Sequence, residues 1–298
     1  MEPVKIRESG GDRLFNAVNY TLMSLILLIV LYPVIFIISS SFSAKEAVSA
    51  GAVLLWPVGF SLEGYQAVFR DPAVLRSIAV SIGYTAAGTL INVVLTIMAA
   101  YPLSRRDLWG RSWLMGLFAF TMFFGGGLIP TYMLVKDMNL LDTPWALLLP
   151  TALSIWNMVI TRTYFNATIP DELLEAAQMD GSSDLTFLWK VVLPLSGPIV
   201  AVIALYYGVE HWNQYFNALL YLKSPKLYPL QLVLREILIR SQVSSDMMGD
   251  SKQMAELAGL SELLKYSLIV VATAPLMLAY PFVQRYFVRG VMIGALKG

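Results

Sequence analysis

The sequence predicts an all-α polytopic membrane protein with six transmembrane helices. Of its 298 residues, 57% are hydrophobic and only 14% are charged, whereas soluble domains carry about 25% charged residues. The apolar residues gather into runs long enough for an α-helix to cross the bilayer, which takes about 20 residues. Each run is expected to be helical because lipid offers the backbone no hydrogen-bond partners.

Six apolar segments meet this length. The first follows a short basic tail of residues 1–16, is longer than the apolar core of a secretory signal and lacks a convincing cleavage site, so we expect an uncleaved membrane helix. Residues 17–298 are then one transmembrane domain. The expected spans lie at 17–40, 77–103, 113–135, 144–165, 191–222 and 266–288.

Glycine and proline interrupt several of these spans, most densely in "FFGGGLIP" at 123–130. Such residues are tolerated in a membrane where neighbouring helices or a water-filled cavity satisfy the freed backbone groups. Two interpretations stay open. The spans are kinked for close packing, or they belong to a bundle whose helices break around a pathway.

Basic residues set the predicted orientation. The short connection at 103–112 carries three of them, whereas the one at 136–143 carries one. We therefore expect both termini in the cytoplasm, the loop 162–190 on the inner side and the loop 223–265 on the outer side.

Composition and motifs exclude several kinds of chemistry. The net charge of +1 gives no basic field for nucleic acid, the absence of cysteine excludes thiolate sites, and a single histidine, His211, cannot build a metal site alone. There is no phosphate-binding loop for ATP and no hydrolase motif. We expect no catalytic residue, no metal and no cofactor bound by this chain.

The inner loop 162–190 contains "PDELLEAAQMDGSSD". Pro170 and the acids Asp171 and Glu172 favour a helix start, and Gly181 suits a left-handed C-terminal cap. Ser182, Ser183 or Asp184 can then cap a second short helix that leads to Pro194. The pattern predicts a helix–turn–helix along the inner membrane surface.

The first of these helices has two kinds of side chain. Leu173, Leu174, Ala177 and the stem of Met179 can pack on the bundle or on a partner, whereas Glu175 and Ala176 are accessible. The small alanines allow close approach, and the glutamate can pair with an arginine. An amphipathic surface helix without any partner is the alternative on this evidence.

The spacing around this helix carries a family resemblance. Glu175, Ala176, Ala177, Gly181 and the "VVLP" of 191–194 follow the pattern E-A-A-x3-G-x9-I-x-L-P, with valine in place of isoleucine. This resembles the signature loop of permease subunits of ABC importers. Almost the whole chain resembles the maltose-type carbohydrate class, and residues 122–150, 208–222 and 284–298 resemble its polysaccharide subfamily, some members of which import alginate or pectin fragments.

The resemblance implies the type I ABC importer permease fold in a bacterial inner membrane. Its coupling helix would dock in a cleft of a separate ATPase through Glu175, Ala176, Ala177, Asp180 and Gly181. The C-terminal tail 289–298 would reach between the two ATPases with Leu296, Lys297 and Gly298. The implied partners are a second homologous permease in a heterodimer, two ATPase subunits that bind ATP and Mg, an extracytoplasmic solute-binding protein, the oligosaccharide and the lipid bilayer.

Polar and aromatic residues in and near the spans are candidates for the sugar path, because aromatic rings stack on sugars and amides hydrogen-bond to them. An ionisable pair inside a span faces a cavity or a partner, although Glu210 and His211 also fit an interfacial aromatic belt. The outer loop 223–265, with helical spacing at its start, either meets an external partner or packs on its own bundle. The path candidates are Glu210, His211, Trp212, Asn213, Tyr215, Asn217, Trp156 and Asn157, with Asn92 as a weaker one.

A stand-alone secondary transporter or a polytopic membrane enzyme is the alternative function. The former needs ionisable residues at mid-membrane to bind its driving ion, and here the spans are nearly free of charge apart from Glu210. The latter needs convergent acids, bases or a metal site. The sequence favours a binding-protein-dependent importer of oligosaccharides.

Overall fold

The computed structural model describes residues 9–246 and 252–295, and their regular secondary structure is entirely helical, which confirms the all-α prediction. Contacts divide the chain into two compact units. The first comprises Met1–Arg70 and Ile237–Val271, and the second comprises Asp71–Glu236 and Ala272–Gly298. Two long helices, α14 (Leu230–Asp246) and α15 (Lys252–Ala295), contribute to both units.

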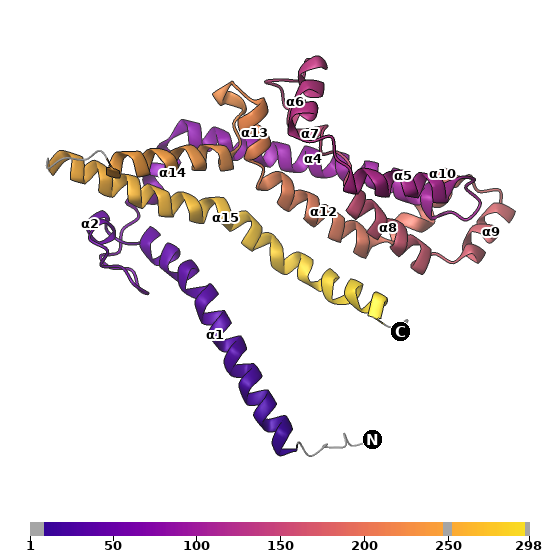
Figure 1. Ribbon diagram of the computed structural model, residues 1–298, viewed down its shortest axis with the longest axis horizontal. Helices are drawn as coiled ribbons and strands as arrows, with labels where there is room; N and C mark the ends of the chain where they lie inside the picture. The colour runs from indigo at the N-terminus through magenta and orange to yellow at the C-terminus, as the bar shows by residue number, and fades with distance from the viewer. Residues whose placement is uncertain (1–8, 247–251, 296–298) are drawn as a thin grey trace. The chain divides into compact units, whose positions relative to one another are not determined.

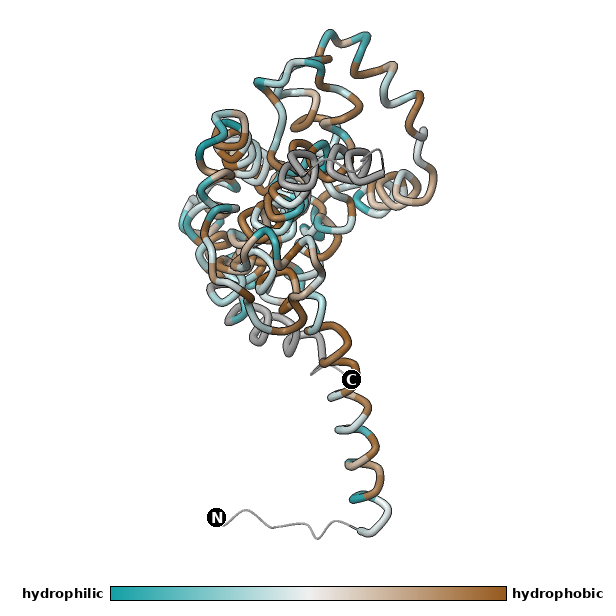
Figure 2. Tube along the Cα trace, turned by 90° about the vertical axis from the view of Figure 1, so that its left-hand side faces the viewer, coloured by the Kyte–Doolittle hydropathy of each residue, from teal (hydrophilic) through white to brown (hydrophobic). Residues whose placement is uncertain are grey.

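The first unit begins with α1 (Gly10–Ser41), which contains the first predicted span. Its most apolar 18-residue window has a mean hydropathy of 2.8 and no buried residue, and hydrophobic positions recur along it in Figure 2. Such a surface is suited to lipid. The unit also contains α2 (Lys45–Ser49), α3 (Glu63–Arg70) and a small core formed by Val48, Val53 and Leu263.

Three helices form the centre of the second unit: α4 (Pro72–Ser104), α8 (Ile155–Thr168) and α12 (Gly197–Trp212). They pack against one another (Figure 1). A buried polar contact joins them, because the hydroxyl oxygens of Thr96 and Tyr207 lie 2.6 Å apart and Tyr207 Oη also accepts from the Ser154 backbone N–H at 3.1 Å.

Shorter elements surround this centre. Before α8 come α5, α6 and α7, and between α8 and α12 come α9, α10, the π-helical turn η1 and α11. After α12 come α13 and the 3-10 turn η2. Their bounds are α5 Arg111–Phe123, α6 Leu128–Asp137, α7 Trp145–Leu148, α9 Asp171–Met179, α10 Asp184–Phe187, η1 Leu188–Val192, α11 Leu193–Leu195, α13 Phe216–Tyr221 and η2 Pro225–Leu227.

Three predicted spans are not continuous helices. The third bends by 109° between α5 and α6 at the run of glycines, where Gly127 has a φ of 85° that favours glycine. The fourth is split at Pro150 into α7 and α8, and α8 has only 14 residues, about 21 Å. The fifth bends by 83° between the segments Asp184–Leu195 and Gly197–Trp212.

The number of spans therefore stays a prediction. Among the described residues, three helices are long and apolar enough to cross a membrane, and the bent pairs raise this number to five if each is one span. The breaks favour the second interpretation of the glycines and prolines, in which helices of the bundle are interrupted.

Candidate functional site

The caps of α9 follow the sequence pattern closely. Pro170 is the N-cap residue, so it lies one position before the first residue of the helix, and Asp171 and Glu172 lie in the first turn. At the other end, Gly181 has a φ of 74°. Its backbone N–H donates to the Gln178 carbonyl at 3.0 Å, and the Ser182 N–H donates to the Ala177 carbonyl at 2.9 Å. These two bonds form a Schellman motif, which ends the helix and reverses the chain.

The reversed chain starts α10 directly. Ser183 is the N-cap, and its hydroxyl accepts from the Thr186 N–H at 3.3 Å. The chain then continues through η1 and α11, which supports the predicted helix–turn–helix. Behind it, Phe187 and Leu188 are buried in the apolar core shared by α4, α8 and α12.

The two faces of α9 differ, although Leu173, which was expected to pack on the bundle or on a partner, is 41% exposed within this chain. Leu174 and Ala177 pack on the apolar core of the second unit. Glu175 and Ala176 are exposed. Met179 is also exposed, at 89%, so its stem does not pack within this chain. The exposed face therefore offers one carboxylate, one small side chain and one flexible apolar side chain to the surroundings.

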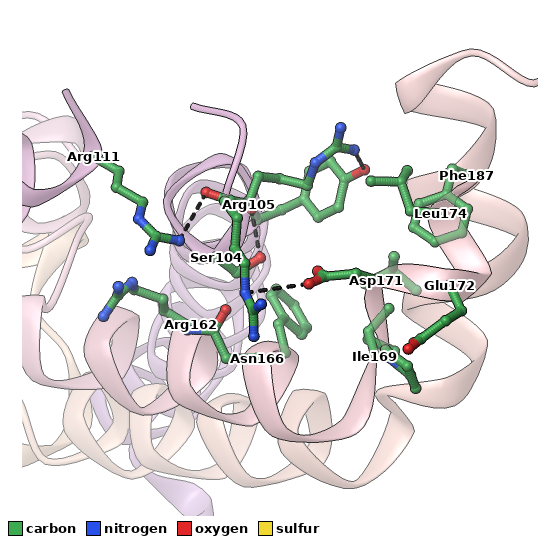
Figure 3. Close-up of a pocket in the computed structure, with 15 residues that line it drawn as sticks. Ser104, Arg105, Arg111, Arg162, Asn166, Ile169, Asp171, Glu172, Leu174 and Phe187 are labelled. Carbon is green, nitrogen blue, oxygen red and sulfur yellow. Dashed lines mark hydrogen bonds and ion pairs between the residues drawn. The ribbon is translucent and has the colours of Figure 1, made fainter. Parts of the chain in front are cut away.

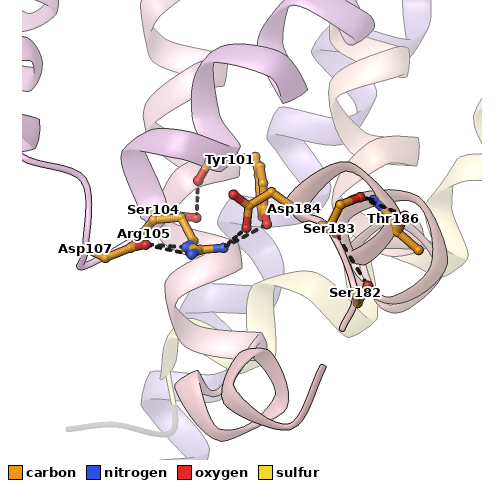
Figure 4. A network of polar contacts seen from close by, with 8 residues as sticks. All are labelled: Tyr101, Ser104, Arg105, Asp107, Ser182, Ser183, Asp184 and Thr186. Carbon is orange, nitrogen blue, oxygen red and sulfur yellow. Dashed lines mark hydrogen bonds and ion pairs between the residues drawn. The ribbon is translucent and has the colours of Figure 1, made fainter. Parts of the chain in front are cut away.

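Ion pairs join the start of each short helix to the connection between α4 and α5, and Figure 4 shows the pair at the start of α10. Arg105 Nη1 lies 3.0 Å from Asp184 Oδ1 at the beginning of α10. Arg106 Nε lies 3.2 Å from Asp171 Oδ2 at the beginning of α9. The α4–α5 connection, residues 105–110, therefore holds both helices of the 162–190 loop.

Arg105 is the centre of this network. It forms a two-pronged bond with Asp107, at 2.9 and 2.7 Å, and also donates to the Tyr101 hydroxyl at 3.1 Å. Its side chain is only 12% exposed. The hydrogen bond to Asp107 raises the pKa of Arg105 above its usual value, and the bond from Arg105 holds the pKa of Asp107 below its usual range. Both groups are therefore charged throughout the physiological pH range.

A polar cavity of about 480 Å³ lies between this connection, α8 and α9 (Figure 3). Four arginines line it: Arg105, Arg106, Arg111 and Arg162. Asp171 and Glu172 line it from α9. The 162–190 loop is thus tied to the end of α4 by charges and to the core of α4, α8 and α12 by apolar packing.

The candidate path residues near the end of α12 divide into buried and exposed groups. His211 and Trp212 are buried, and Trp212 Nε1 donates to the Ala272 carbonyl at 2.8 Å. Glu210 and Asn213 are exposed, and Asn213 Nδ2 donates to the Val209 carbonyl at 2.9 Å. This arrangement gives Trp212 a structural contact and leaves Glu210 on the surface of the chain.

The other path candidates lie in three places. Tyr215 is 43% exposed in the break between α12 and α13, and the guanidinium of Arg235 lies 5.6 Å from its ring centroid. Asn217 is half-buried on α13. On α8, Trp156 is 59% exposed, whereas the neighbouring Asn157 is buried. Asn92, the weaker candidate, is buried on α4 and donates to the Thr151 carbonyl at 3.0 Å.

Sequence reasoning missed the arginines as part of the site. Arg105 and Arg106 appeared only as topology signals, and Arg235 beside Tyr215 gave no signal at all. The acid pair of Asp171 and Glu172 was interpreted through the helix dipole alone, yet Asp171 also forms an ion pair. The tail residues Leu296, Lys297 and Gly298 lie outside the described residues, and α15 is helical through Ala295, beyond the predicted start of the tail at 289.

Comparison with known proteins gives consistent matches over nearly the full length. A family model described as a binding-protein-dependent transport system inner membrane component matches residues 92–293. The polygalacturonan/rhamnogalacturonan transport system permease protein YtcP of Bacillus subtilis (strain 168) is 43% identical over 288 residues, which are 96% of this chain and 99% of that protein. Protein LplC of the same organism is 40% identical over 293 residues, 98% of each chain.

A solved structure matches the fold. A chain in the crystal structure of a bacterial ABC transporter involved in the import of the acidic polysaccharide alginate is 33% identical to this one. The TM-score is 0.86, and the match covers 95% of this chain and 100% of that chain.

Proposed function

This chain belongs to the family of binding-protein-dependent transport system inner membrane components, as a permease subunit of an ABC importer, and we propose that it carries acidic oligosaccharides. The sugar class is supported by the relative named for polygalacturonan and rhamnogalacturonan transport and by the structural neighbour involved in alginate import. Both names refer to uronate-containing polymers. The subunit itself is not an enzyme.

The complex we propose contains a second, homologous permease, two ATPase subunits that bind ATP and Mg, and an extracytoplasmic binding protein. Both termini and the 162–190 loop lie on the cytoplasmic side in this assembly. The basic residues at 105, 106 and 111 support this orientation, since cytoplasmic loops are enriched in lysine and arginine. The C-terminal residues 296–298 would reach the ATPases.

One observation carries the proposed coupling. The capped helix α9 exposes Glu175 and Ala176 while its other face packs on the core of α4, α8 and α12. A helix with a free outer face and an anchored inner face can dock into a cleft of a partner and transmit the partner's movement to the bundle. Asp180 and Gly181 complete the exposed end of this surface.

The test is a charge reversal on the exposed face. We expect Glu175→Lys to leave the subunit in the membrane with its partner permease but to abolish substrate-stimulated ATP hydrolysis, because a lysine would oppose a basic or hydrogen-bond-donating socket. Lys190→Glu is the matched control, since Lys190 is exposed in the same loop but outside α9. Undiminished oligosaccharide uptake by Glu175→Lys, or an equal loss in the control, would refute the coupling role.

The substrate is tested separately by uptake in a strain expressing the full transporter. Oligogalacturonate and alginate oligosaccharides are compared with neutral oligosaccharides of the same length. Accumulation of acidic oligosaccharides, absent without this subunit, is the expected result. Uptake restricted to neutral sugars would overturn the proposed substrate class while leaving the coupling intact.

A further inference from the structure

The four arginines of the cavity beside α9 are not equally neutralised. Arg105 pairs with Asp107 and Asp184, and Arg106 pairs with Asp171. Arg111 and Arg162 make no ion pair with the parts of the chain that the structure describes. Instead, Arg111 Nη1 donates to the Arg105 carbonyl at 3.3 Å, and Arg162 Nε donates to the Leu103 carbonyl at 2.8 Å.

These two backbone contacts fix the guanidiniums without using most of their hydrogen bonds. An arginine has five N–H donors, so each retains several that can serve a ligand. Both side chains are half-buried, and Figure 3 shows them on the same side of the cavity, with Asn166 of α8 beside Arg162. Two like charges that line one cavity repel each other unless an anion lies between them.

Glu172, an acid of the cavity wall, also forms no ion pair with the described residues, but it belongs to α9 on the opposite side in Figure 3. The excess positive charge is thus local to Arg111 and Arg162. Paired guanidiniums suit an anion with several oxygens, because each planar fork can donate two parallel N–H bonds. A phosphate group matches this requirement.

The neighbouring residues indicate where the phosphate would come from. Arg111 is the first residue of α5, and it lies between Trp109 and Trp113, which are 94% and 69% exposed. Tryptophans gather at the level of the lipid head groups. Basic pockets between helices on the cytoplasmic side of a membrane bind anionic head groups.

We infer that the cavity beside α9 binds the phosphate head group of an anionic lipid through Arg111 and Arg162. This inference rests on the proposed cytoplasmic placement of the 162–190 loop. Arg111 donates to the Arg105 carbonyl in the α4–α5 connection, whose arginines pair with Asp171 and Asp184. A lipid bound to Arg111 would therefore stabilise the connection on which α9 and α10 rest and make ATPase coupling depend on lipid composition.

The experiment measures lipid retention by the purified transporter in native mass spectrometry, with phosphatidylglycerol or phosphatidylcholine supplied. The double variant Arg111→Gln/Arg162→Gln should retain phosphatidylglycerol at least about tenfold more weakly, as expected for the loss of charge-assisted hydrogen bonds. Lys190→Gln, which removes an exposed charge from the 162–190 loop outside the cavity, should retain it like the wild type. Equal retention by the double variant and the wild type would overturn the site.

A second arm separates the lipid from free phosphate. If inorganic phosphate raises the melting temperature of the wild type but not of the double variant, and phosphatidylglycerol is not retained, the lipid is the wrong source. If the double glutamine variant does not assemble, Arg111→Lys/Arg162→Lys replaces it, because lysine preserves the charge. This variant should retain phosphatidylglycerol to an intermediate extent. Lipid retention does not require transport, so a transporter that retains lipid but imports no acidic sugar would refute the proposed function and not this site.

Discussion

Replacing Gly88 by alanine should destabilise the contact between α4 and α12. Gly88 is buried in α4, and a Cβ atom there would lie 2.5 Å from Cε1 and 2.6 Å from Cδ2 of His211. His211 is itself buried, so its ring has little room to move. Overpacking of this kind costs about 1–3 kcal/mol, whereas alanine gains at most about 1 kcal/mol over glycine in helix propensity. Contacts of 2.5 and 2.6 Å with a buried ring put the overpacking cost at the upper end of its range, about 3 kcal/mol, so the net loss should be about 2 kcal/mol.

The measurement is the melting temperature of the purified subunit complex, which should fall by about 2–8 °C. Gly83→Ala is the matched control, because Gly83 is exposed on the same helix and a Cβ there meets nothing within 4 Å. It should be neutral or slightly stabilising. In a His211→Ala background the cost of Gly88→Ala should disappear, since the clashing ring is gone. An unchanged melting temperature for Gly88→Ala, or the same cost with alanine at 211, would refute the reasoning.

Three further changes test other parts of the second unit. Gly181→Ala places a Cβ at a φ of 74°, which costs about 1–2 kcal/mol, so limited proteolysis should cut the end of α9 faster than in the wild type. Gly116→Ala is the control, because a Cβ at this position of α5 meets nothing within 4 Å, and it should not change the rate of cleavage at α9. Asp142 accepts from two backbone N–H groups and from the Ser224 hydroxyl, and these bonds hold its pKa below the usual value. The stabilisation of the fold by ionised Asp142 is therefore complete above the unfolded pKa of about 3.9 and is lost as the pH falls through the folded pKa. On acidification, the melting temperature of Asp142→Asn should fall less steeply than that of the wild type. Asp184→Asn should lower the ratio of uptake to ATP hydrolysis while costing little stability, because Asp184 is 68% exposed; an unchanged ratio would mean that this ion pair does not position α10 for coupling.

The local structure of the 162–190 loop could be predicted because short-range chemistry determines it. The Schellman motif at Gly181 and the N-cap at Ser183 depend on residues within a few positions. The same holds for the bend at Gly127, where three glycines and a proline follow one another. What the pattern did not reveal was how sharply the chain bends at such breaks, since the angle depends on the elements that pack on either side.

The long-range contacts of the site had no signal in the sequence. Arg105 and Asp184 are 79 positions apart, and Asp142 reaches Ser224 across 82 positions. A single sequence shows that these residues are charged but not which of them meet. The same limit applies to Arg111 and Arg162, whose proximity follows only from the packing of α5 and α8.

The contacts between the 162–190 loop and the bundle differ in strength, and the difference indicates separate roles for them. Ion pairs with exposed partners contribute about 0–1 kcal/mol each, and Arg106 and Asp171 are 78% and 53% exposed. Burial of one large apolar side chain, such as Phe187, contributes about 1.5–3 kcal/mol. The apolar contacts of Leu174, Ala177 and Phe187 therefore hold the loop against the core of α8 and α12, whereas the arginines fix the position of each short helix against the end of α4. A movement of α9 that preserved both the apolar packing and the ion pairs would have to rotate the α4–α5 connection with it, because the starts of α9 and α10 are both paired with that connection.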